Sequence, residues 1–175
     1  MVVATALRSA VGGSATAASM PAGVVFALAL LALAAGAGWR LGRPSLAAVG
    51  IGVAGGAVLV AAWLSSRSGV AVELAPVNTV IATWTPAVAL IAVAEEVVLR
   101  GVLFDAVRGW GGDGWALAAT TVLFAAVHVP LYGFGALPLD LAVGLLLGGL
   151  RVVSRGVLAP AIAHLIADLA GGWLL

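Results

Sequence analysis

The chain has 175 residues, of which 63% are hydrophobic and only 9% are charged, and its formal net charge is +1. Soluble domains carry about 25% charged residues, so this composition cannot cover a globular protein with polar surface and favours an integral membrane protein. The small net charge argues against nucleic acid as a partner. Because cysteine is absent, disulfides, thiolate metal sites and a cysteine nucleophile are excluded.

Six apolar stretches have about the length that a bilayer-spanning helix needs, which is roughly 17–25 residues. Trp residues lie near their ends, as expected for side chains that prefer the headgroup level. The predicted spans are 22–38, 46–64, 80–107, 114–131, 137–153 and 156–174. The sequence therefore predicts an all-α, polytopic membrane helix bundle of about six transmembrane helices.

The polar residues divide the chain into three predicted parts. Residues 1–21 are expected to be a flexible N-terminal tail, residues 22–79 two accessory transmembrane helices, and residues 80–175 the motif-bearing core. Glycines at 52, 55 and 56 and at 144 and 148 form small-xxx-small patterns, which predict that helix backbones approach closely there.

Arginine is the only basic residue other than histidine, and its positions predict an orientation. Arg40, Arg43, Arg108, Arg151 and Arg155 are expected in loops on one side, and only Arg8 and Arg67 on the other. The positive-inside rule places the first group in the cytoplasm and both termini outside. The use of Arg without Lys, together with 24 Gly, is typical of a GC-rich coding genome. This favours a bacterial protein, and therefore the bacterial plasma membrane as its location.

Charges near the predicted span ends are expected to be solvated. Asp105 and Arg108 are expected to form one solvated pair or a helix cap. Asp140, Asp113 and Glu73 are interpreted as loop or boundary charges.

Two carboxylates and a guanidinium lie in the middle of the third predicted span, at Glu95, Glu96 and Arg100. An ionised group at bilayer depth costs about 2.5–3.5 kcal/mol, so such a cluster is a functional-site hypothesis by default. Glu96 and Arg100 are four residues apart, which predicts an ion pair on one helix face. Glu95 is rotated by about 100° from Glu96 and is expected to face a different neighbour.

The same four-residue spacing recurs in two later spans, between Phe124 and His128 and between His164 and Asp168. Asp168 is expected to accept a hydrogen bond from His164 or from a neighbouring helix. Taken singly, each histidine also fits a core group that is hydrogen-bonded to a neighbouring helix.

Together these three motifs, in this order on successive apolar segments, resemble the CPBP family of type II CAAX prenyl endopeptidases and their Abi-type bacterial relatives. The resemblance covers roughly residues 80–175. It implies an intramembrane endopeptidase that hydrolyses a peptide bond of a membrane-associated protein or peptide. It also implies that Glu95 activates water, that His128 helps to bind and polarise it, and that His164 and Asp168 support the oxyanion or orient the site. Glu96, Arg100 and Phe124 would be structural supports.

Other functions stay open on the sequence alone. No cofactor is expected, but Glu95, His128 and His164 are also the ligand set of a zinc-dependent membrane metalloprotease. Against zinc, the chain has no H-E-x-x-H motif. A proton-relay transporter and a non-enzymatic membrane scaffold or immunity protein are the further alternatives. The expected partners are the lipid bilayer and a membrane-associated peptide or protein substrate.

Overall fold

The computed structural model describes residues 20–66 and 79–174, and all the elements in these residues are helical. They are α2 (Met20–Gly36), α3 (Leu46–Ser66), α4 (Thr79–Glu96), the π-helix η1 (Val97–Leu103), α5 (Phe104–Tyr132), the 3-10 helix η2 (Phe134–Ala136), α6 (Leu137–Ser154) and α7 (Leu158–Trp173). The all-α prediction is confirmed for this part of the chain. Arg8, Arg67, Glu73 and nearly all of the predicted N-terminal tail lie outside the described residues.

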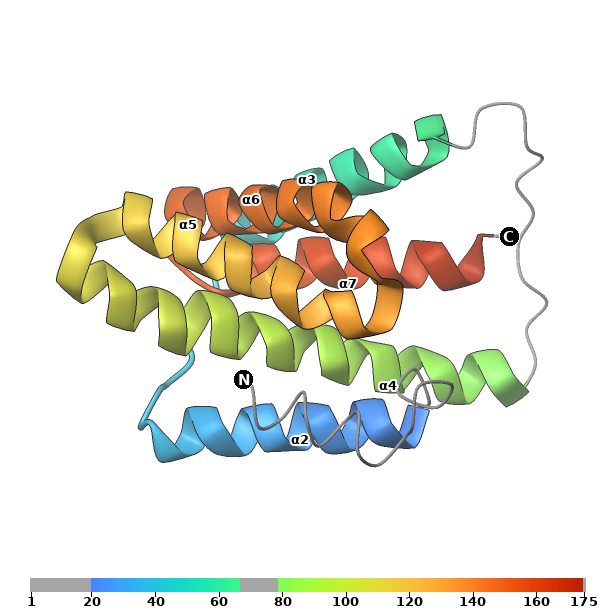
Figure 1. Cartoon of the computed structure of the whole chain (residues 1–175), viewed down its shortest axis with the longest axis horizontal. Coiled ribbons are helices and arrows are strands. Elements are labelled where there is room, and N and C mark those ends of the chain that lie inside the picture. The colour runs from blue at the N-terminus through green and yellow to red at the C-terminus, as the bar shows by residue number, and fades with distance from the viewer. Residues whose placement is uncertain (1–19, 67–78, 175) are drawn as a thin grey trace.

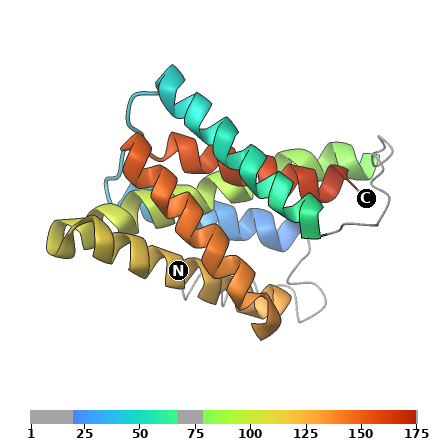
Figure 2. The same ribbon diagram turned by 90° about the horizontal axis from the view of Figure 1, so that it is seen from above.

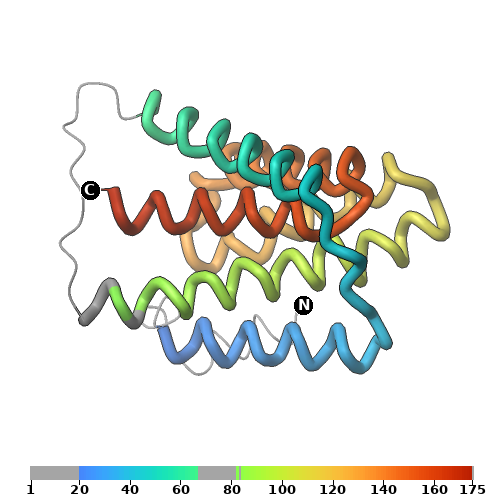
Figure 3. Tube along the Cα trace, turned by 180° about the vertical axis from the view of Figure 1, so that it is seen from behind, coloured from blue at the N-terminus to red at the C-terminus, as the bar shows by residue number. Residues whose placement is uncertain are grey.

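The helices pack as a bundle around α7 (Figures 1 and 3). α7 lies between α3 and α4, and α2 packs against the outer side of α4. α5 and α6 form an antiparallel pair that is joined through Gly133 and η2. Figure 2 shows the same arrangement from above. The division into accessory helices and a catalytic core stays a prediction, although α3 from the first part packs directly on α7 from the second.

Glycines let these helices approach closely, as their spacing predicts. A Cβ at Gly52 would lie 2.7 Å from the backbone oxygen of Ala159, and one at Gly56 would lie 2.8 Å from the Ile166 Cβ. Both contacts join α3 to α7. On α6, a Cβ at Gly144 would meet the backbone oxygen of Thr121 on α5 at 3.2 Å. The glycine patterns are therefore packing sites.

The predicted third span continues through α4 and η1 into α5 without leaving helical geometry. The direction reverses at Gly112, where φ is 78° and ψ is −177°. L-residues with a Cβ rarely adopt a positive φ, so glycine suits this turn. The boundary predicted between the third and fourth spans, residues 107–114, contains this residue.

The π-helix η1 follows directly after the two adjacent glutamates and contains Arg100. A π-turn disrupts the regular i→i−4 ladder and leaves backbone carbonyls to find other donors. The carbonyl of Arg100 accepts a 2.7 Å hydrogen bond from Nε of Arg151 on α6. The Nη2 of Arg151 in turn lies 2.6 Å from the Asp105 carboxylate.

These contacts correct two predictions about charges. Arg151 is buried in the last turn of α6 and does not lie in a loop, so it is not a solvated loop charge. Asp105 pairs with Arg151, whereas Arg108 pairs with Asp113 at 2.8 Å in a half-exposed ion pair. The Arg151 guanidinium thus takes the place of the expected solvent, because it satisfies both the buried Arg100 carbonyl and the Asp105 carboxylate.

Two helices in the described residues are long and apolar enough to cross a membrane, namely α3 and the segment Phe134–Ser154 that contains α6. α2 and α7 are shorter apolar helices of 17 and 16 residues. Large apolar side chains are also at least half exposed on several helices, which is expected of a lipid-facing surface. They include Leu28, Leu33, Val53, Val58, Val122 and Leu145. The count of six crossings stays a prediction.

Candidate active site

The predicted ion pair between Glu96 and Arg100 is confirmed and is completely buried. Arg100 Nη1 lies 2.7 Å from Glu96 Oε1, and neither side chain is exposed. Arg100 Nη2 donates to the carbonyl of Gly144 on α6 at 3.0 Å. The guanidinium also lies 4.8 Å from the centre of the Phe124 ring, within cation–π range. Arg100 therefore ties η1 to both α5 and α6.

Glu96 has a second partner that sequence reasoning missed. Its Oε1 accepts a 2.9 Å hydrogen bond from Nδ1 of His164, 68 residues further along the chain. A local spacing rule cannot detect this contact, because it depends on how α7 is rotated against α4. The only signal in the sequence was the presence of buried ionisable groups on both spans.

His164 lies among three carboxylates. Its Nδ1 faces Glu96, while its Nε2 lies 3.5 Å from Asp168 Oδ2 and 4.0 Å from Glu95 Oε2. The predicted pairing with Asp168 is therefore present, but the contact with Glu96 is shorter. Glu95 and His164 also lie close together, since the two buried side chains approach to 4.0 Å.

His128 is oriented by its own helix. Its Nδ1 lies 2.8 Å from the carbonyl of Phe124, and because a carbonyl only accepts, Nδ1 carries the proton and donates. In the neutral imidazole, Nε2 then carries the lone pair. The Phe124 ring packs against both histidines, with its centre 4.4 Å from the His128 ring centre and 5.5 Å from that of His164.

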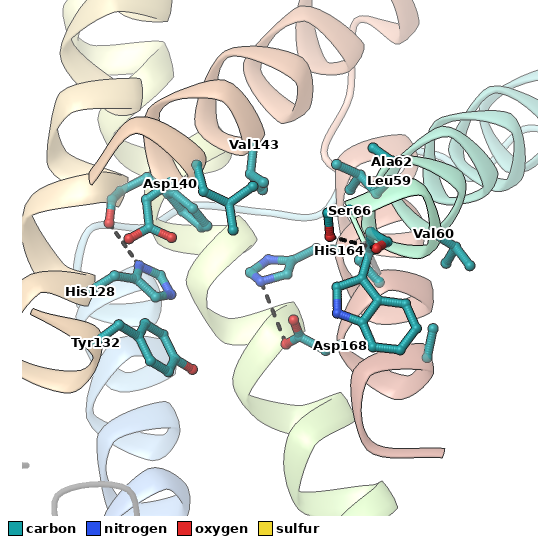
Figure 4. A pocket seen from close by; sticks show the side chains of 15 residues that line it. Leu59, Val60, Ala62, Ser66, His128, Tyr132, Asp140, Val143, His164 and Asp168 are labelled. Atoms are coloured by element: carbon teal, nitrogen blue, oxygen red, sulfur yellow. Dashed lines mark hydrogen bonds and ion pairs between the residues drawn. The ribbon is translucent and has the colours of Figure 1, made fainter. Parts of the chain in front are cut away.

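Both histidines line one cavity of about 290 Å³ at the end of the bundle where η2 joins α5 to α6 (Figure 4). Its walls come from α3, α5, α6 and α7. The lining residues are Leu59, Val60, Ala62, Trp63, Ser66, Phe124, His128, Tyr132, Leu139, Asp140, Val143, His164, Ala167, Asp168 and Ala170. Glu95 and Glu96 are not among the lining residues, but both lie close to His164, which does line the cavity.

Asp140 was wrongly interpreted as a boundary charge. Its side chain is only 8% exposed and lines the cavity (Figure 4). The mistake arose because Asp140 lies in the first turn of α6, near the predicted span end. The apolar residues on both sides of it were the signal, because a carboxylate within an apolar helix is rarely accidental.

The zinc alternative requires three ligands that converge on one point. In the part of the chain that the structure describes, no group of three His, Asp or Glu side chains is placed to hold a metal ion. The His164 Nδ1 is also bonded to Glu96. The residues of the proposed ligand set therefore do not fit a metal centre in this arrangement.

The comparison with protein families agrees with this arrangement of motifs. A family model described as "Type II CAAX prenyl endopeptidase Rce1-like" matches residues 77–170, which is more than half of the chain. The chain belongs to this Rce1-like family. No curated protein and no solved structure matches it.

Family membership implies a hydrolase that cleaves peptide bonds, with a peptide or protein as its substrate. Its members are membrane proteins, which agrees with the two long apolar helices. The matched region begins near the start of α4 and ends within α7, so it contains all three motifs.

Proposed function

We propose that this chain is an intramembrane endopeptidase of the CAAX protease-like, glutamate-dependent type. In this proposal Glu95 is the general base, His128 binds and polarises the attacking water, and His164 stabilises the oxyanion with Asp168 as its positioning residue. Glu96, Arg100 and Phe124 hold the site together. The observation that carries the proposal is that Glu95 and His164 approach to 4.0 Å beside a cavity that both histidines line.

The division of labour between the adjacent glutamates follows from their contacts. Glu96 Oε1 already accepts hydrogen bonds from Arg100 and His164, which fixes the carboxylate in a structural position. Glu95 Oε2 lies beyond hydrogen-bond distance from His164 Nε2, at a separation that one shared water molecule can bridge. We assign the attacking water to this position.

The charges of the cluster support the same assignment. Three carboxylates, on Glu95, Glu96 and Asp168, are faced by Arg100 and by His164. If His164 is an imidazolium, it donates from both nitrogens and the cluster carries one excess negative charge. Proton transfer from water to Glu95 removes that charge, so the cluster becomes neutral as the nucleophile forms.

The reaction then has two steps. The water oxygen attacks the scissile carbonyl carbon while its proton moves to Glu95, and the resulting oxyanion is stabilised by the His164 Nε2–H. When the tetrahedral intermediate collapses, the C–N bond breaks and the proton from Glu95 passes to the leaving amine. His128 can orient the water because its Nδ1–H donates to Phe124 and leaves the Nε2 lone pair available.

The proposal is tested by comparing Glu95→Gln with Glu96→Gln. The full chain in proteoliposomes is incubated with a library of internally quenched peptides, and products are identified by mass spectrometry. Glu95→Gln should abolish cleavage at a normal yield of folded protein, because it removes the base and keeps the shape. Glu96→Gln should mainly lower that yield, because Arg100 and His164 lose their anionic partner. Equal behaviour of the two variants in both measurements would contradict the proposal.

Metal dependence is tested on the same preparation. Treatment with 1,10-phenanthroline or EDTA should leave wild-type cleavage unchanged, because no step of the proposed reaction involves a metal. Loss of activity that is restored by zinc would favour the metalloprotease alternative.

A further inference from the structure

We propose that Asp140 is the anionic end of a substrate subsite, and that the cavity selects a peptide with a positively charged side chain, Arg or Lys, next to the bond that is cut. This inference rests on the proposed endopeptidase function. It starts from a buried carboxylate for which the reaction above has no role.

Asp140 is buried without a hydrogen-bond partner for one of its oxygens. Its side chain is 8% exposed, it faces the cavity, and no donor in the described residues contacts its Oδ2 (Figure 4). Leaving a charged group buried and unpaired costs more than leaving a neutral one, and a partner that arrives with the substrate removes that cost.

The neighbouring His128 does not supply this partner in its observed orientation. Figure 4 shows the two side chains together on one side of the cavity. The ring proton of His128 is on Nδ1 and is donated to the Phe124 carbonyl. The other nitrogen of the neutral ring is an acceptor, so it cannot donate to the Asp140 carboxylate.

The rest of the cavity suits a long cationic side chain. Leu59, Val60, Leu139 and Val143 provide apolar walls, and no Arg or Lys of the described residues lines the cavity. Lys and Arg side chains combine an apolar stem with a charged head, which matches apolar walls that end at a carboxylate. The volume of about 290 Å³ is near the lower limit of ligand pockets, which is about 300 Å³. This size favours one extended side chain.

The two buried arginines in the part of the chain that the structure describes are engaged elsewhere. Arg100 contacts Glu96 and Gly144, and Arg151 contacts Asp105 and the Arg100 carbonyl. Asp140 also lies in the first turn of α6, where the helix dipole favours a negative charge. The buried arginines of the described residues therefore leave Asp140 without a cationic partner.

The test uses peptides that differ at one position. A sequence that the wild type cleaves is synthesised as an internally quenched peptide with Arg, Gln or Glu at each of the two positions on either side of the scissile bond. At one position, kcat/KM for Arg should exceed that for Gln by about 10- to 100-fold, as expected for a buried hydrogen bond to a charged group. Asp140→Asn should remove this preference and leave the Gln peptide cleaved within about twofold of wild type.

Controls separate the subsite from general damage. Asp113→Asn removes a half-exposed carboxylate that is paired with Arg108 and should leave the preference intact. Asp140→Ser is a second variant, with its folded yield measured alongside. No preference for Arg in the wild type, or an equal loss on all three peptides in Asp140→Asn, would overturn the inference; the latter result would make Asp140 a positioning residue for His128.

A binding measurement keeps this inference distinct from the proposed function. Fluorescent Arg and Gln peptides are titrated onto Glu95→Gln and onto Glu95→Gln/Asp140→Asn in proteoliposomes. Tighter binding of the Arg peptide should occur only when Asp140 is present. If the wild type cleaves no peptide, the proposed function fails, and this comparison alone decides whether the subsite exists.

Discussion

Replacing Arg100 by Met should destabilise the protein far more than the same change at Arg108. Both arginines form short ion pairs, at 2.7 Å with Glu96 and at 2.8 Å with Asp113. They differ in burial, because the Arg100 pair has no exposed surface whereas both members of the Arg108 pair are about half exposed. The comparison isolates burial as the variable.

The expected magnitudes follow from what each change leaves behind. Arg100→Met leaves Glu96 buried with His164 as its remaining hydrogen-bond partner and removes the hydrogen bond to the Gly144 carbonyl. Breaking a buried ion pair costs about 3–5 kcal/mol. The exposed pair at Arg108 is worth about 1 kcal/mol or less. At about 1.4 kcal/mol for each tenfold change, the ratio of folded to unfolded protein should differ between the two variants by roughly 1.5 to 3.5 powers of ten.

The assay is unfolding in detergent micelles by titration with SDS, followed by circular dichroism or tryptophan fluorescence. The double variant Glu96→Gln/Arg100→Met should be more stable than Arg100→Met, because it also removes the buried carboxylate that lost its arginine partner. Equal losses for Arg100→Met and Arg108→Met would refute the reasoning, as would a double variant no more stable than Arg100→Met.

Three further predictions use the same preparations. Gly52→Ala should destabilise the protein by about 1–3 kcal/mol in the SDS titration, because its Cβ would lie 2.7 Å from the Ala159 backbone oxygen at the α3–α7 contact. Gly50→Ala is the control and should be neutral or stabilising, because its Cβ would have no neighbouring atom within 4 Å. Asp168→Asn should lower kcat by about fivefold or less, since Asp168 is 39% exposed and its 3.5 Å pair with His164 is worth about 1 kcal/mol at most; a loss of a hundredfold would show a direct role in catalysis. A cysteine placed at the exposed Gly135 of η2 should react with an impermeant reagent in intact cells, because the arginine bias predicts that the η2 end of the bundle lies outside; protection would reverse the topology.

Local features of this fold were predictable from the sequence. Helix positions follow from the length of apolar runs and the Trp residues at their ends, and the pair Glu96–Arg100 follows from the pitch of one helix. Contacts between helices were not predictable, because they depend on the rotation of each helix about its axis. The Glu96–His164 hydrogen bond is the clearest example.

One helix face held information that sequence reasoning left unused. Along α6 the buried residues are Asp140, Gly144, Leu147, Gly148 and Arg151, which fall on a single stripe at helical spacing. The stripe places Asp140 and Arg151 on the same inward face as the packing glycines. The nearness of Asp140 and Arg151 to the span ends suggested that both are solvated. Their helical spacing with the buried glycines instead indicates that both are buried, as the structure shows.

The π-helix restricts how this chain can change in evolution. A π-turn corresponds to one residue inserted into an α-helix, so loss of any residue within Val97–Leu103 would allow regular α-geometry to return. The part of the helix before the deletion would then turn by about 100° relative to the part after it. Both glutamates would rotate away from α7, even though no functional side chain had been replaced. Homologues that keep this geometry should therefore tolerate substitutions among the apolar residues of η1 far better than a change in its length.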